Sequence, residues 1–201
     1  MKYPLWKKIF DVLGSLLGLI LISPFVPLIG LLIKLESEGP VIEKLDRVSG
    51  GKTVKVYKFR SMVVGASTTK EQLEHLNERK DGPLFKIKHD PRVTGKIGRF
   101  LRKTRLDEFP QLINVLKGEI ALVGPRPREP KEAKMYPVEY KKILEVRNGV
   151  TGLSQVNGAS SLPFLEELKL DKFYIENSSF WLDLKIVLKT LAILFFDSTA
   201  V

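Results

Sequence analysis

Asp107 and Glu108 are adjacent acids whose type and position suit chemistry on a phosphate group. Apolar residues between Pro110 and Gly118 recur at helical spacing and predict a short helix. Proline is tolerated only in the first turn of a helix, and glycine commonly follows the last turn. The two acids are therefore expected at the N-terminal end of this helix, where the backbone N–H groups and the helix dipole favour negative charge.

Arg102 and Arg105 precede the two acids by about one helical turn. Because positive neighbours stabilise a carboxylate, we expect Asp107 to be ionised. An ionised carboxylate among arginines suits a nucleophile or a Mg²⁺ ligand in phosphate chemistry. The alternative is that the two acids only cap the helix.

The segment that leads to these acids, residues 86–105, is strongly basic. Its lysines and arginines stand against a single acid, Asp90. Within residues 94–105, apolar and basic residues each recur three and four positions apart, so each kind shares one face of a predicted helix. An amphipathic basic helix is typical of a membrane surface or of anion binding, although a solvated face is the plainer alternative.

Two loops further along the chain could also contact a ligand. Three prolines between residues 125 and 130 predict an extended loop that presents Arg126 and Arg128 rigidly to a phosphate or a nucleobase, unless it is a plain surface linker. The Gly-rich segment 148–158 could bring backbone close to a ligand, but it lacks a dinucleotide-binding fingerprint.

An uncharged apolar run over residues 12–33 has the length of a membrane-spanning helix. A removable signal peptide is the competing interpretation, but the run is long and lacks a small-residue cleavage pattern. Ser23, Pro24 and Pro27 interrupt it, and proline removes a helical hydrogen bond. The helical part of the run before Ser23 then measures about 16 Å, roughly half of the ~30 Å bilayer core.

Lysines flank the apolar run on both sides, so the positive-inside rule gives no direction. The symmetric interpretation is a re-entrant helix that enters the membrane, bends at Ser23 and Pro24, and leaves on the same side. A kinked helix that crosses the membrane fully is the alternative.

Three more elements follow from local patterns. Two β-prone runs flank Gly50-Gly51 and predict a hairpin. The segment Gly51-Lys52-Thr53 is not the end of a nucleotide-binding P-loop, because Asp46 stands where that pattern needs glycine. Residues 66–82 are polar and predict a helix with His75 on its solvent side. The apolar run 180–196 predicts a helix, in the core or at a membrane interface.

Composition limits the possible classes. The chain has 201 residues, 44% of them hydrophobic, a formal net charge of +10, no cysteine and two histidines. These values exclude global disorder, a disulfide scaffold, a Cys-based metal site and a His-rich one. The charge predicts a polyanionic partner. A membrane adaptor that binds anionic lipid is a rival to an enzyme, and nucleic acid is not expected because aromatic residues near the basic ones are sparse.

These motifs together resemble the bacterial sugar transferases, monotopic phosphoglycosyl transferases that start glycan assembly on a polyprenyl phosphate carrier. The resemblance covers nearly the whole chain and rests on several ordered motifs: Lys7 to Asp11, Ser23-Pro24, Tyr57 to Met62, Asp90 to Arg92, Gly98 to Gly118, Gly124 to Pro127 and Gly149 to Gly152. The chain looks like the minimal form of the family.

The resemblance implies a reaction and a set of roles. Asp107 would attack the β-phosphate of a UDP-sugar, release UMP and hold a covalent phospho-sugar until polyprenyl phosphate takes it. Glu108 would help Asp107 to hold Mg²⁺. The remaining implied roles are phosphate binding by Lys58 and Arg102, uridine binding by Arg126, a less defined polar role for Asp171, and the helix kink at Ser23 and Pro24.

The implied fold is α+β and mainly helical, with a re-entrant membrane helix over residues 1–35 and a catalytic domain over residues 36–201. That domain would hold the β-hairpin and interfacial amphipathic helices, on the cytoplasmic face of the bacterial inner membrane. One departure concerns Ala159, which follows Gln155-Val156-Asn157-Gly158 where the family usually has Arg. A phosphate-binding cation is therefore expected to be missing there, unless Ser160 or Ser161 donates to the phosphate instead or another arginine reaches it.

Overall fold

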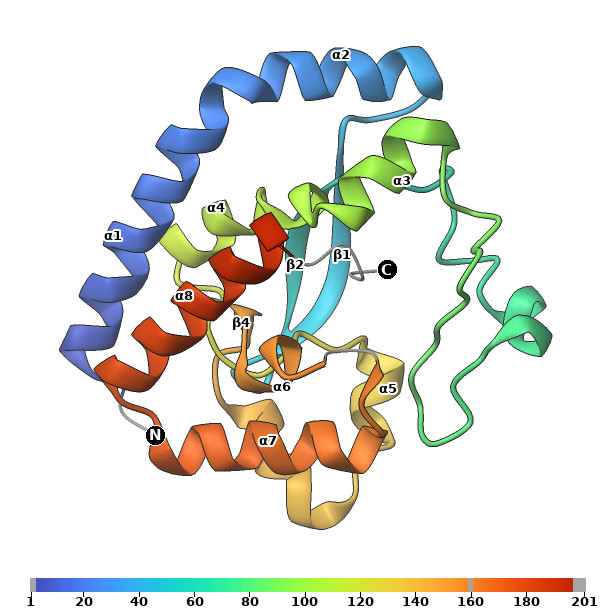
Figure 1. Ribbon diagram of the computed structural model, residues 1–201. Helices are drawn as coiled ribbons and strands as arrows, with labels where there is room; N and C mark the ends of the chain where they lie inside the picture. Colours follow the sequence, from blue (N-terminus) through green and yellow to red (C-terminus); the bar gives the residue numbers. More distant parts are fainter. Residues whose placement is uncertain (1–2, 159–160, 197–201) are drawn as a thin grey trace.

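The computed structural model describes residues 3–158 and 161–196 and has a mainly helical fold with two small sheets (Figure 1). The α-helices are α1 Leu5–Ile22, α2 Val26–Glu36, α3 Gly95–Lys103, α4 Gln111–Leu116, α5 Pro130–Lys134, α6 Leu153–Val156, α7 Phe164–Asn177 and α8 Phe180–Phe196. The strands are β1 Ile42–Ser49, β2 Lys52–Phe59, β3 Ala121–Val123 and β4 Gly149–Thr151. The 3-10 helices are η1 Ser23–Phe25, η2 Glu71–Leu76, η3 Leu106–Glu108 and η4 Val138–Glu145.

The apolar run forms two helices that meet at an open bend (Figure 1). The bend lies at η1, where the Ser23 hydroxyl donates to the Ile20 carbonyl at 2.9 Å. By length and composition, Leu5–Glu36 is the one stretch of the described chain that could cross a membrane. Only 17% of its apolar window is buried, whereas the core helix of a soluble protein is mostly buried.

One face of α1 carries buried polar residues four positions apart, and this face packs on the rest of the protein. Lys7 forms an ion pair of 2.6 Å with Asp183 of α8 and donates to the Tyr174 hydroxyl at 3.0 Å. Asp11 accepts the Leu122 backbone N–H at 3.0 Å. Because these groups are buried, their mutual contacts hold α1 against α8 and β3.

The opposite faces of α1 and α2, and η1 between them, expose large apolar side chains. They include Leu5, Leu13, Leu17, Ile20, Leu21, Phe25, Leu28, Leu31 and Leu35, each more than half exposed. A contiguous apolar surface of this extent marks an interaction with a membrane or another apolar partner.

Glu36, the last residue of α2, holds the start of α3. Its carboxylate accepts the backbone N–H groups of Ile97 at 2.9 Å and Gly98 at 3.0 Å. These are N–H groups that a helix leaves unpaired in its first turn. The contact fixes the basic helix α3 to the end of α2, and Figure 1 shows the two side by side.

The predicted hairpin is confirmed. β1 and β2 are antiparallel with Ser49 opposite Lys52, and Gly50 and Gly51 both have positive φ, as a tight two-residue turn requires. The second sheet, a parallel pair of β3 and β4, was not predicted from the sequence. Its strands have three residues each, too few to show a pattern.

The core consists of separate apolar clusters that join elements distant in sequence. Ile33 of α2, Phe59 of β2 and Leu101 of α3 share one cluster. Val123 of β3 and Ile186 of α8 share another. The first cluster holds the end of β2 against α3, and Phe59 of β2 and Arg102 of α3 both line one cavity.

Two sequence expectations change. The predicted helix over residues 66–82 is wrong beyond a short 3-10 helix, η2; His75 is on its exposed surface. The predicted C-terminal helix is confirmed as α8. Its Ile186 is buried in the core, whereas Trp181 and Leu188 are exposed.

Candidate active site

The two acids lie in η3, the short 3-10 helix between α3 and α4. The sequence placed them at the start of the helix that ends before Gly118, but that helix, α4, begins only at Gln111. Asp107 is buried and Glu108 is partly exposed. Both line a cavity of about 820 Å³, which is within the usual size range of ligand sites.

Lys58 of β2 brings a positive charge to both carboxylates. Its Nζ atom lies 2.6 Å from a Glu108 carboxylate oxygen and 3.8 Å from an Asp107 carboxylate oxygen. The ammonium group is closer to Glu108, so Asp107 keeps the weaker electrostatic contact of the two.

The surroundings shift the pKa values of Asp107 and Glu108 in opposite directions. Burial raises the pKa of Asp107, the Lys58 charge opposes the rise, and the Glu108 charge adds to it. Burial also acts to raise the pKa of Glu108, but the charges of Lys58 and Arg126 outweigh it and lower that pKa to about 2. The direction for Asp107 is opposite to the one expected from its arginine neighbours alone, because burial dominates. Different pKa directions in a carboxylate pair are typical of different chemical roles.

Three arginines lining the cavity have no partner for their side chains. They are Arg102, Arg105 and Arg126, and none of their guanidinium groups forms a hydrogen bond or ion pair within residues 3–158 and 161–196. With Lys58, they place four cations beside the two carboxylates. This surplus of positive charge suits a ligand with several negative charges.

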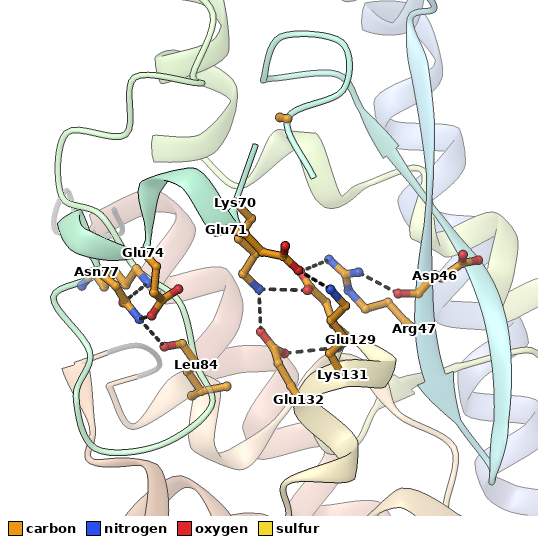
Figure 2. A network of polar contacts seen from close by, with 12 residues as sticks. Asp46, Arg47, Lys70, Glu71, Glu74, Asn77, Leu84, Glu129, Lys131 and Glu132 are labelled. Carbon is orange, nitrogen blue, oxygen red and sulfur yellow. Dashed lines mark hydrogen bonds and ion pairs between the residues drawn. The ribbon is translucent and has the colours of Figure 1, made fainter. Parts of the chain in front are cut away.

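Another part of the cavity lining carries acidic and basic side chains that pair with one another (Figure 2). Lys70 lies 2.8 Å from Glu129 and 3.2 Å from Glu132, and Arg47 lies 3.8 Å from Glu129. These contacts join the segment after β2 to α5 and β1. Because these basic groups already have acidic partners, they offer a ligand less free positive charge than the unpaired arginines near the dyad.

The structure distinguishes the two arginines of the proline-rich loop, which the sequence treated alike. Arg126 lines the cavity without a side-chain partner among the described residues, whereas Arg128 is buried and binds Glu167 and the Tyr136 hydroxyl. Glu167 also pairs with Arg79 at 2.7 Å. Arg128 is therefore held as a structural residue of the cavity wall. The spacing of residues in the sequence could not predict the ion pairs of Glu167, because its two partners lie 39 and 88 residues away in the chain.

Asp171 lies on α7 behind the cavity and does not line it. One of its carboxylate oxygens accepts the Ser154 hydroxyl at 2.7 Å, and the other has no hydrogen-bond partner in the described part of the chain. Burial raises the pKa of Asp171 to about 7, although the Ser154 hydrogen bond and the Arg128 charge act against the rise. Ala159, the departure noted in the sequence, lies outside the described residues.

The donor set at the dyad fits Mg²⁺ in kind and in number. No group of three or more acidic, His or Cys side chains in the described ranges forms a ready-made metal cage. Mg²⁺ is commonly held by one or two carboxylates together with substrate phosphates, and Asp107 and Glu108 supply two.

The comparisons with known proteins agree on one family. A family model described as bacterial sugar transferase matches residues 2–197. Galactosyl transferase CpsE of Streptococcus agalactiae serotype III is 39% identical over 197 residues, which cover 96% of this chain and 43% of the relative. Undecaprenyl-phosphate galactose phosphotransferase of Salmonella typhimurium is 39% identical over 189 residues, which cover 92% and 39%.

The chain spans about two fifths of the length of these two relatives. A relative of more similar length is the exopolysaccharide production protein ExoY of Rhizobium meliloti. It is 36% identical over 189 residues, which cover 92% of this chain and 83% of the relative.

Proposed function

The chain belongs to the bacterial sugar transferase family, and from this premise we propose that it transfers a sugar 1-phosphate from a UDP-sugar to polyprenyl phosphate. The names of several relatives include undecaprenyl phosphate as the acceptor. The observation that carries the proposal is the pair of adjacent acids, one of them buried, beside four cations in one cavity.

Asp107 is the proposed nucleophile. Its carboxylate oxygen attacks the β-phosphorus of the UDP-sugar, the bond from that phosphorus to the bridging oxygen breaks, and UMP leaves with the bridging oxygen. A phosphate oxygen of the polyprenyl carrier then attacks the same phosphorus and frees Asp107. The raised pKa of Asp107 supports this role, because a more basic carboxylate is a stronger nucleophile.

The cations of the cavity reduce the repulsion between the carboxylate and the anionic substrates. Lys58 and Arg102 are proposed to bind phosphate, and Arg126 the uridine end of the donor. Glu108, which stays ionised, would hold Mg²⁺ together with Asp107; bound Mg²⁺ supplies further neutralisation of phosphate charge. Asp171 is proposed to support the site from behind through Ser154.

We further propose that α1 and α2 form a re-entrant membrane helix and that the site faces the cytoplasm. Both ends of this pair contact the same body of the protein: Lys7 pairs with Asp183, and Glu36 binds the start of α3. A helix that crossed the bilayer would hold its two ends roughly 30 Å apart, on opposite sides. The exposed apolar residues of α3 and α8, such as Phe100 and Trp181, support an interfacial position for these helices.

This topology predicts that both ends of the helix pair are reached only from the cytoplasm. The chain lacks cysteine, so Lys8→Cys and Glu38→Cys each introduce a single exposed thiol. An impermeant maleimide should label neither variant in intact spheroplasts and both after the membrane is opened. Labelling of only one of them from outside would show a full crossing. Pro24→Ala with Pro27→Ala should shift the protein toward that pattern.

The proposed activity is tested by UMP release. Detergent-solubilised protein with Mg²⁺ and undecaprenyl phosphate is incubated with each member of a panel of UDP-sugars, and UMP is measured. We expect release with at least one donor, and the same screen identifies the sugar. Protein that stays folded and binds anionic vesicles but releases no UMP from any donor would favour the adaptor instead.

A further inference from the structure

Arg105 has a backbone conformation that its residue type disfavours. Its φ of 55° and ψ of 16° are left-handed, and it is the only non-glycine residue with positive φ in the part of the chain that the structure describes. It follows the last turn of α3, the position that glycine most often occupies at a helix end. An L side chain crowds the backbone there, so arginine makes this turn less stable than glycine would.

No hydrogen bond or ion pair of the Arg105 guanidinium with a described residue compensates for this strain, although its charge helps to lower the pKa of Glu108. The side chain is half-buried and lines the cavity, yet its guanidinium forms no hydrogen bond, ion pair or ring contact with any described residue. Other cavity arginines, such as Arg92 and Arg128, are held by Asp90 and Glu167. Strained backbone that the fold does not need is characteristic of functional sites.

The position of Arg105 indicates what its side chain binds. It is two residues from Asp107, and Arg102 and Arg126 line the same cavity, also without side-chain partners in residues 3–158 and 161–196. A guanidinium presents a planar set of donors that matches the oxygens of a phosphate.

We propose that Arg105 is a further substrate-binding residue, kept in a strained backbone because its guanidinium binds the phosphate of the substrate that lies over Asp107. The proposal rests on the proposed function. The phosphate belongs either to the UDP-sugar or to the polyprenyl carrier, and the two half-reactions separate these sources.

The test compares Arg105→Gly, Arg105→Ala and Arg105→Lys with wild type. Arg105→Gly relieves the strain and removes the guanidinium, so the thermal midpoint without ligand should rise by about 2–4 °C. Arg105→Ala removes the guanidinium and keeps the strain, so its midpoint should not rise. Arg105→Lys keeps the charge and should retain more activity than either. Lys141→Ala, an exposed charge on η4, controls for the loss of one positive charge.

Two sets of measurements, one for each half-reaction, show which phosphate Arg105 binds. In the donor arm, UDP affinity is measured by calorimetry and UMP release is measured without carrier. In the acceptor arm, undecaprenyl phosphate is added to the preformed adduct and its consumption is timed. Arg105→Gly should either weaken UDP binding and slow UMP release, or slow the consumption of undecaprenyl phosphate, by at least tenfold. The half-reaction that is affected identifies the phosphate that Arg105 binds.

The result that overturns the proposal is an Arg105→Gly protein with wild-type behaviour in both arms. A lower thermal midpoint for Arg105→Gly would also overturn it, because the side chain would then stabilise the fold. If wild type itself neither binds UDP nor releases UMP, the proposed function fails, which is a separate result.

Discussion

Asp107→Asn is expected to abolish turnover, by at least about a thousandfold, because an amide cannot serve as the nucleophile. The substitution keeps the size of the side chain, and Asp107 makes no hydrogen bond to protein that the amide would break within residues 3–158 and 161–196. Intact-protein mass spectrometry after incubation with a UDP-sugar and no carrier should detect a phospho-sugar adduct in wild type and none in Asp107→Asn.

Glu108→Gln is the matched control. It removes the neighbouring carboxylate that Lys58 contacts at 2.6 Å. If Glu108 positions Mg²⁺, the variant should be impaired less severely, and higher Mg²⁺ should restore part of its rate. An adduct that persists in Asp107→Asn would remove Asp107 from the nucleophile role.

Lys7→Met is expected to destabilise the protein by about 3–5 kcal/mol, because it leaves a buried carboxylate without its positive partner. Asp183 is completely buried, and the Lys7 ammonium, at 2.6 Å, also donates to the Val123 carbonyl at 2.9 Å. The free energy of unfolding in detergent, from denaturant titration, measures the effect.

Lys8→Met provides a control at the next position, since Lys8 is exposed. It removes the same charge from the same helix and should change stability by less than about 0.5 kcal/mol. Adding Asp183→Leu to Lys7→Met should recover part of the loss, because the unpaired charge is removed. Equal effects of Lys7→Met and Lys8→Met would show that the buried ion pair does not hold α1 in place.

Local patterns in the sequence predicted the features that depend on neighbouring residues. The Gly50-Gly51 turn follows from the positive φ that glycine allows, and the bend at Ser23 and Pro24 follows from a missing backbone donor. The dyad and its basic surroundings were also visible, because Arg102, Arg105 and Asp107 lie within one short segment. The roles assigned to these residues came from the family resemblance and stay predictions.

The tertiary structure decided which of these charged residues are available to a ligand. Arg126 and Arg128 are two residues apart, and their sequence context does not distinguish them. Glu167, 39 residues beyond Arg128, forms an ion pair with Arg128 and not with Arg126. Asp171 is placed behind the cavity, and burial reverses the expected pKa direction of Asp107. Pairing, burial and the left-handed backbone at Arg105 depend on contacts between segments far apart in the chain. Periodicity and composition carry no information on such contacts, because they describe only what lies within a few turns of each residue.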